Sequence, residues 1–181
     1  MAVTRQSVRA LSAALGLALL AGFGLTAAPA VAADGPVGSV SGLPIPRFVS
    51  LKSDRVNVRG GPNKDQEVRW VYTRAGMPVE ITAEFENWRR IRDADGTEGW
   101  VYHSLLSGKR TAMVTAKTAD ALVPVYESPD LKSGVVARLE RGVVGVVKRC
   151  DDGWCSFHGK GFEGFIQETR LWGVYPNEKV D

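Results

Sequence analysis

The sequence predicts an all-β protein in which two small β-barrels follow one another along the chain, after an N-terminal signal peptide. Three observations support this prediction. Residues 1–33 have the composition of an export signal, the rest of the chain contains two similar halves, and apolar and polar positions alternate in short runs across residues 48–175. Since no helical apolar period of four turns occurs in that last range, strands are expected there.

The first 33 residues are expected to be a signal peptide. Arg5 and Arg9 form a basic start, residues 10–33 are uncharged and apolar, and residues 31–33, Val-Ala-Ala, are the small residues that precede a cleavage site. Residues 28–30, Ala-Pro-Ala, form a second motif of this kind. The competing interpretation is an uncleaved membrane anchor, but three glycines and a proline interrupt the apolar run. We therefore expect a periplasmic or secreted protein with no stable membrane insertion after cleavage.

The charge of the exported chain is close to neutral. The full sequence has 181 residues, a net charge of +3 and a pI of about 9.0, which by itself would suggest a nucleic-acid or membrane partner. Removing the signal peptide with Arg5 and Arg9 lowers the net charge to +1. Because most of the basic excess belongs to the removed segment, we expect no nucleic-acid partner.

The chain after residue 33 contains an internal repeat. Three pairs of segments carry it: residues 56–62 with 123–129 at an offset of 67, Trp88 with Trp154 at an offset of 66, and residues 98–101 with 163–166 at an offset of 65. The expected organisation is a flexible lead-in at residues 34–47, a first barrel at 48–110, a second barrel at 115–175 and a tail at 176–181.

Each repeat contains short runs with the pattern of strands. Residues 77–83 alternate apolar and polar side chains, which suits a strand with one buried face. Residues 143–147 are nearly all Val, as expected of a more deeply buried strand. Turn-forming segments such as residues 93–96, Asp-Ala-Asp-Gly, separate the runs. Short strands at such close spacing indicate small barrels.

Cys150 and Cys155 are the only cysteines in the sequence. Residues 151–153, Asp-Asp-Gly, are typical of a hairpin turn, so the two cysteines are expected to face each other across it and to form a disulfide after export. A redox-active pair more often has two intervening residues, whereas four separate these cysteines. The two histidines, His103 and His158, are 55 positions apart and have no nucleophile signature beside them, so we expect neither a metal site nor a catalytic residue.

The motifs of the first repeat form an ordered set. The segment VNVRGGP at residues 56–62, then Gly76, Trp88 and the segment DGTEGWV at residues 95–101, together resemble the bacterial SH3-like domain. This resemblance covers residues 50–108 or so. It implies a small β-barrel that acts as a binding module, often for cell-wall peptide or a periplasmic protein, and often attached to a wall hydrolase.

The second repeat, at residues 116–174 or so, is a degenerate copy of the same pattern. It keeps Pro129 and Trp154, but Phe165 replaces Trp100. Its two cysteines around the tryptophan also resemble family members from exported bacterial proteins.

Aromatic side chains are the candidate ligand-binding residues. Trp88 and Ile91 are three positions apart, so in a regular strand they point to opposite faces, and the aliphatic Ile91 is the better core candidate. The resemblance to SH3 domains implies that a tryptophan at this place lines the peptide groove. The alternative is that Trp88 folds over the end of the barrel as part of the core. The expected ligand-binding residues are Trp70, Tyr72, Trp88, Arg89 and, in the second repeat, Trp154.

These inferences predict an exported, non-enzymatic binding module that recognises cell-wall peptide or a periplasmic protein segment and needs no cofactor. An alternative is a structural or adaptor subunit whose aromatic faces contact a protein partner and never a wall ligand. A third interpretation, an accessory domain of a hydrolase, requires a catalytic polypeptide encoded elsewhere.

Overall fold

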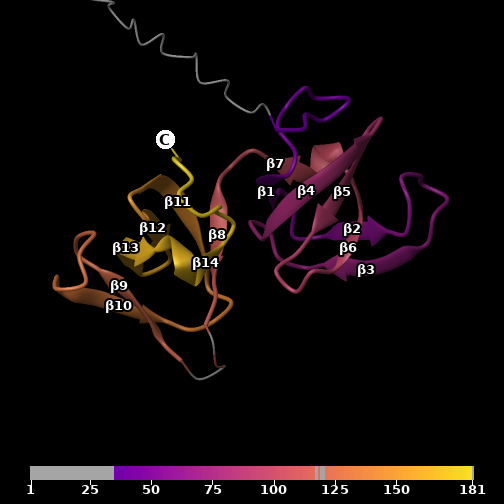
Figure 1. The fold of residues 1–181 in the computed structure, drawn as a ribbon. Helices are drawn as coiled ribbons and strands as arrows, with labels where there is room; N and C mark the ends of the chain where they lie inside the picture. The colour runs from indigo at the N-terminus through magenta and orange to yellow at the C-terminus, as the bar shows by residue number, and fades with distance from the viewer. Residues whose placement is uncertain (1–34, 117, 119–120, 181) are drawn as a thin grey trace, which may run out of the picture. The chain divides into compact units, whose positions relative to one another are not determined.

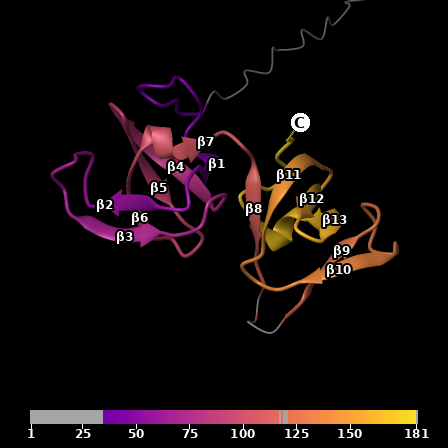
Figure 2. The ribbon, with the colours of Figure 1, turned by 180° about the vertical axis from the view of Figure 1, so that it is seen from behind.

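The computed structural model describes residues 35–116, 118 and 121–180, so the expected signal peptide and both cleavage motifs lie outside the described residues. The described chain folds into two seven-stranded antiparallel sheets, each curved into a small barrel (Figure 1). Figure 2 shows the same strands from behind. The predicted all-β, tandem-barrel fold is confirmed. Within the described ranges, no helix has the length and apolar character needed to cross a membrane.

Barrel 1 is built from the first seven strands. Their bounds are β1 (Arg47–Leu51), β2 (Val56–Arg59), β3 (Val68–Tyr72), β4 (Pro78–Phe85), β5 (Trp88–Arg92), β6 (Glu98–Tyr102) and β7 (Leu106–Ser107), with the short helix η1 (His103–Leu105) before β7. Across the sheet the strands lie in the order β3-β2-β6-β5-β4-β1-β7.

Barrel 2 repeats this topology strand for strand. Its strands are β8 (Thr111–Val114), β9 (Val123–Tyr126), β10 (Val135–Leu139), β11 (Val144–Asp151), β12 (Trp154–Gly159), β13 (Phe162–Gln167) and β14 (Leu171–Trp172), with the short helix η2 (Glu168–Arg170) before β14. Their order is β10-β9-β13-β12-β11-β8-β14. The structural repeat therefore includes β1 and β8, which precede the segments whose sequences match.

The core of barrel 1 follows from strand alternation. In β2, Val56 and Val58 are fully buried while Asn57 between them is exposed, because successive side chains point to opposite faces. The apolar cluster consists of Leu51, Val56, Val58, Val79, Ile81, Ile91 and Val101. Ile91 is therefore a core residue, as expected, but Trp88 is buried as well, so the three-residue spacing does not leave the tryptophan exposed.

A glycine before an aromatic residue in β6 and β13 has a steric reason. A Cβ atom at Gly99 would lie 2.4 Å from Cγ1 of Val58, and a Cβ atom at Gly164 would lie 2.5 Å from the carbonyl oxygen of Tyr126. Both barrels thus require glycine where the neighbouring strand approaches closely.

The core of barrel 2 contains the predicted disulfide. Cys150 and Cys155 face each other on β11 and β12, and their sulfur atoms are bonded at 2.03 Å. Asp152 and Gly153 between them have φ of 48° and 77°, as two-residue hairpin turns require. Both cysteines are buried beside Phe157, so the bridge ties two strands together from inside the barrel.

The segment before β1 is folded, although its Gly, Pro and Ser content predicts flexibility. Val37 pairs with Pro44 as an isolated β-bridge, and the loop between them closes over the fully buried carboxylate of Glu84. Glu84 accepts hydrogen bonds from the backbone N–H of Ser41 at 2.8 Å and from the Arg47 guanidinium at 2.7 Å. The anchor lies more than 40 positions away in β4, so the composition of the segment gives no sign of it.

The segment after β14 is also held, although it is expected as a tail. Val180 is buried and exchanges two backbone hydrogen bonds with Cys150. Glu178 accepts hydrogen bonds from both terminal nitrogens of the Arg110 guanidinium, at 2.7 and 2.9 Å. Burial alone would raise the pKa of Glu178, but the hydrogen bonds to Arg110 and to the Tyr175 N–H lower it.

Residues of β1, β4 and the segment 172–175 contact one another within the compact unit Asp34–Asp181. The Phe48 ring packs against Trp172 and Tyr175, with ring centroids 5.0 and 4.6 Å apart. The hydroxyl of Tyr175 donates a hydrogen bond to Oε1 of Glu80 at 2.7 Å, and the Nε–H of Arg92 donates to Oε2 at 2.8 Å. The buried carboxylate of Glu80 is thus satisfied on both oxygens.

Candidate functional site

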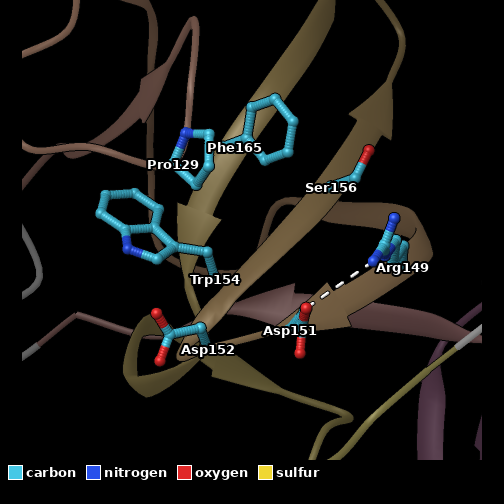
Figure 3. Close-up of a pocket in the computed structure, with 7 residues that line it drawn as sticks. All are labelled: Pro129, Arg149, Asp151, Asp152, Trp154, Ser156 and Phe165. Carbon is cyan, nitrogen blue, oxygen red and sulfur yellow. Dashed lines mark ion pairs between the residues drawn. The ribbon is translucent and has the colours of Figure 1, made fainter.

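Barrel 2 carries a pocket of about 410 Å³ on the outer face of the hairpin formed by β11 and β12. We name this pocket groove 2. Its lining combines an apolar side with charged groups: Pro129, Trp154 and Phe165 on the one hand, and Arg149, Asp151, Asp152 and Ser156 on the other. Figure 3 shows the rings of Trp154, Pro129 and Phe165 gathered together, with the ion pair between Arg149 and Asp151 on the other side.

Strand alternation positions these side chains. In β12, Cys155 and Phe157 are fully buried, so Trp154 and Ser156 project outward into groove 2. In β11, the buried Cys150 separates Arg149 from Asp151, which both project outward. The disulfide therefore lies directly behind the groove and holds together the two strands that form it.

The ring of Trp154 is held by one aromatic neighbour. Tyr126 of β9 meets it edge-on, with ring centroids 5.5 Å apart and planes at 87°. Phe165 of β13 lies opposite Tyr126 in the register of β13 and β9. Phe165 contributes the second aromatic ring of the groove 2 lining. Trp154 remains partly exposed, so the groove presents an indole whose position is fixed and whose surface is accessible.

The electrostatics of groove 2 are mixed. Nη2 of Arg149 lies 3.6 Å from Oδ2 of Asp151, and both side chains are more than half exposed. Such an exposed pair is weak and exchanges easily with other charged groups. Asp152 adds a further carboxylate. The arrangement offers a cation for a ligand carboxylate and two carboxylates for a ligand cation, next to an apolar surface.

Barrel 1 has a depression at the equivalent position, which we name groove 1. It has a wider part of about 640 Å³ and a smaller part of about 210 Å³, and Lys64, Trp88 and Tyr102 line both. Pro62 and Trp88 in groove 1 correspond in the repeat to Pro129 and Trp154 in groove 2. The two grooves are therefore equivalent positions with different charged surroundings.

Trp88 is both a buried side chain of barrel 1 and a residue of the groove 1 lining. Its ring meets Tyr102 edge-on, with centroids 5.4 Å apart, and it lines groove 1. It is nevertheless only 7% exposed. Groove 1 thus presents one edge of a buried indole, whereas groove 2 presents a partly exposed one.

Arg89 is not one of the described residues that line groove 1. Its buried guanidinium donates to the carbonyl oxygens of Glu86 and Trp88, both at 2.9 Å, and its Nε lies 3.4 Å from Oε1 of Glu84. The cations in the lining of groove 1 are instead Arg59 and Lys64. Neighbouring positions on a strand point to opposite faces, which separates Arg89 from the tryptophan beside it.

Trp70 and Tyr72 lie together on β3. Neither of them is among the described residues that line groove 1 or groove 2. Their rings are edge-on with centroids 6.2 Å apart, and both pack against the core of barrel 1. The hydroxyl of Tyr72 donates a hydrogen bond to Oδ2 of Asp93 at 2.8 Å. Burial, together with this hydrogen bond, raises the pKa of Tyr72, so it remains a neutral donor that braces the turn at Asp93.

The expected ligand-binding residues did not include Pro129, Phe165 or Arg149 of groove 2, nor Tyr102 of groove 1. One signal was present, because the proline precedes the tryptophan at a nearly constant distance in both repeats. A side-chain set of the kind that ligates metals, three or more His, Cys, Asp or Glu residues, does not occur within the described ranges.

Solved structures similar to this chain include two proteins of one organism. They are NlpC2 from Trichomonas vaginalis, with a TM-score of 0.32 and 13% identity over 70% of this chain, and NlpC1 from the same organism, with a TM-score of 0.33 and 14% identity over 75%. This chain covers 48% of the length of each of them. No curated protein matches the sequence.

A family model described as "Bacterial SH3 domain" matches twice, at residues 52–108 and at residues 119–173. The first matched segment covers barrel 1 except β1, and the second covers barrel 2 except β8. Together the two segments cover more than half of the sequence. The chain therefore belongs to the bacterial SH3 domain family and carries two tandem copies of the domain.

Proposed function

We propose that this protein is exported and that it binds a peptide segment of the cell wall in groove 2, with groove 1 as a second and weaker site. The observation that carries the proposal is the lining of groove 2, where Trp154, Phe165 and Pro129 form an apolar surface beside charged side chains. Binding is the primary role in this proposal, in keeping with the family, whose members are generally binding modules without catalysis.

The apolar side of groove 2 suits an extended peptide. A flat ring such as that of Trp154 covers a large apolar area and loses little conformational freedom when a ligand packs on it. Pro129 and Phe165 extend the same surface. Grooves lined by aromatic rings are a recurring way of holding extended peptide backbone.

The charged side of groove 2 favours a peptide with both a carboxylate and an ammonium group. Arg149 is able to pair with a carboxylate, and Asp151 or Asp152 with an ammonium group. Because Arg149 and Asp151 form only an exposed ion pair with each other, a ligand displaces it at little cost. Cell-wall peptides carry free groups of both kinds.

Groove 1 is expected to bind more weakly. Trp88 is 7% exposed, so less of its surface is available to a ligand than in the case of the partly exposed Trp154. The cations Arg59 and Lys64 give part of groove 1 a positive character and favour ligand carboxylates. Trp88 and Trp154 are thus proposed as ligand contacts, while Trp70, Tyr72 and Arg89 support barrel 1.

Export is the second part of the proposal. It rests on the order of basic, apolar and small residues in residues 1–33 and on the disulfide, which is favoured in an oxidising compartment. N-terminal sequencing of the exported protein should begin at Asp34 or, if the earlier motif is used, at Val31. Retention of Met1 in a membrane fraction would contradict export with cleavage.

Binding to the cell wall is tested with purified wall material. The wild-type protein should be retained on it, and Trp154→Ala should reduce retention. Val68→Ala is the matched control, since Val68 is an exposed apolar residue of β3 outside both groove linings. An NMR titration with defined wall peptides should then shift the signals of β12 and β13. Equal retention of the wild-type and Trp154→Ala proteins would exclude groove 2 as the binding site.

A second candidate is an adaptor that contacts a protein partner. The observation that favours it is on β10, at the edge of barrel 2, where Val135 and Val136 are 39% and 51% exposed. An edge strand with apolar side chains is a surface on which another strand is able to add. Failure of wall retention, combined with a specific protein partner that is lost in Val136→Lys, would favour the adaptor.

A further inference from the structure

A set of polar side chains adjoins groove 2 on the outer face of the β12–β13 hairpin. Ser156 and His158 are two positions apart in β12 and therefore project from the same face of the sheet. Glu163 of β13 lies opposite His158 in the strand register. No nucleophile is adjacent to His158 in the sequence, but alternation along β12 brings the side chains of Ser156 and His158 together on one face.

The three side chains form a chain of contacts. Oγ of Ser156 lies 2.8 Å from Nε2 of His158, and Nδ1 of His158 lies 3.3 Å from Oε1 of Glu163. Since an ionised carboxylate only accepts hydrogen bonds, it favours the tautomer with the proton on Nδ1. Nε2 is then free to accept the hydrogen bond that the Ser156 hydroxyl donates. Nucleophile, base and orienting carboxylate are thus connected in the order required for serine activation.

The surroundings place the nucleophile where a ligand binds. Ser156 lines groove 2 together with Trp154 and Phe165. The His158 side chain is only 17% exposed, whereas Glu163 is 75% exposed. A ligand seated on the apolar rings therefore has its polar groups within reach of a serine whose base is shielded from solvent.

We propose that Ser156, activated by His158 and Glu163, cleaves carboxylic esters whose apolar part rests on Trp154 and Phe165. Oγ of Ser156 attacks the carbonyl carbon while its proton passes to Nε2 of His158. The bond to the ester oxygen breaks, and the proton moves from Nε2 to the departing alcohol. A water molecule then attacks the acyl-serine and gives one proton to Nε2, which returns it to Oγ of Ser156, so that the carboxylic acid is released and the serine is restored.

Arg149 is the group that would stabilise the oxyanion. It lies opposite Ser156 in the register of β11 and β12, and both residues line groove 2. A guanidinium replaces the pair of backbone N–H groups that serves this purpose in many hydrolases. Because Arg149 is 70% exposed and also pairs with Asp151, its stabilisation is modest. We therefore assign activated esters as the substrate class, and not amides.

This activity is additional to peptide binding and rests on the same groove. A fluorophosphonate probe tests it, with the adduct located by peptide mass spectrometry. The full exported chain should be labelled at Ser156, and hydrolysis of p-nitrophenyl butyrate should exceed that of the Ser156→Ala variant. His158→Gln should slow both reactions by about 100-fold, the lower end of general-base effects. Ser104→Ala, which changes an exposed serine of η1, should react like the wild type.

Two results would overturn the proposal: no adduct at Ser156 in the wild type, or an adduct that forms equally fast in His158→Gln. Because labelling of the wild-type protein is read at a named residue, the first result does not depend on whether any variant folds. The test is also separate from that of peptide binding. If Ser156 reacts but wall peptides shift no signals, the binding proposal fails alone, and if peptides bind but Ser156 is inert, the ester-cleavage proposal fails alone.

Discussion

Trp154 stands edge-on to Tyr126 with ring centroids 5.5 Å apart, and Trp88 stands edge-on to Tyr102 at 5.4 Å. The supporting tyrosine comes from β9 in barrel 2, but from β6 in barrel 1. The two tryptophans of the repeat are thus held in the same way by residues that are not equivalent. The two tryptophans also differ in exposure, since Trp88 is buried and Trp154 is partly exposed. Substitutions at the two positions are therefore expected to have different effects.

Trp154→Ala should weaken binding of wall peptide by at least about tenfold, since it removes the indole from the apolar side of groove 2. Trp154→Phe should retain part of the affinity because a flat ring remains. Titration calorimetry with a defined wall peptide measures both. The midpoint of thermal unfolding of Trp154→Ala should stay close to that of Trp154→Phe, because Trp154 is partly exposed.

Trp88→Ala should destabilise barrel 1 by about 3 kcal/mol or more, since it empties the space of a side chain that is only 7% exposed. Urea unfolding followed by the NMR signals of β5 and β6 provides the measurement. The signals of β12 and β13 serve as the internal reference for barrel 2. A loss of groove 1 binding without any loss of stability would instead assign Trp88 purely to the ligand surface.

Removal of the disulfide in a Cys150→Ser, Cys155→Ser variant should cost about 2 kcal/mol of the free energy of unfolding, because the closed loop is short. Groove 2 should lose affinity as well, since Arg149, Asp151, Trp154 and Ser156 all flank the bridge. Non-reducing peptide mapping of the wild type should show both cysteines in one bridged peptide. Two alkylatable thiols in the native protein would contradict the disulfide.

Acid should release the segment before β1. Burial by itself raises the pKa of Glu84, but hydrogen bonds from Ser41, Arg47 and Val40 outweigh it and lower the pKa from 4.5 to about 2. A carboxylate with a lowered pKa in the folded state stabilises the protein above the unfolded pKa, and this contribution disappears as the pH falls through the folded value. The stabilisation is therefore complete above about pH 5 and is lost between about pH 4.5 and pH 2.

The size of this acid effect is about 3 kcal/mol by linkage. Amide hydrogen exchange at Val40 and Ser41 over this pH range measures it, since both N–H groups donate to Glu84. Glu84→Gln should expose the two amides at neutral pH. Glu67→Gln is the matched control, because its carboxylate is 80% exposed. Unchanged protection in Glu84→Gln would show that the carboxylate does not hold the segment.

Short-range patterns in the sequence were sufficient to predict the tandem barrels. The alternation around Val79 and Ile81 specifies a strand face, and the turn at residues 151–153 specifies a hairpin that brings two cysteines together. Gly99 and Gly164 are repeated because a neighbouring strand leaves no room for a side chain. Each of these features depends on neighbours within one hairpin or one repeat, so the chain itself encodes them.

The partners of individual side chains depended on strands that are distant along the chain. Arg89 is adjacent to Trp88, yet it pairs with Glu84 on the opposite face, and Glu84 in turn holds Ser41 of a segment with the composition of a linker. The groove 2 lining combines Pro129, Arg149 and Phe165 from separate parts of barrel 2. Burial and charge pairing between such residues arise only when the barrel closes, because closure decides which exposed positions become neighbours and which of them a ligand is able to reach.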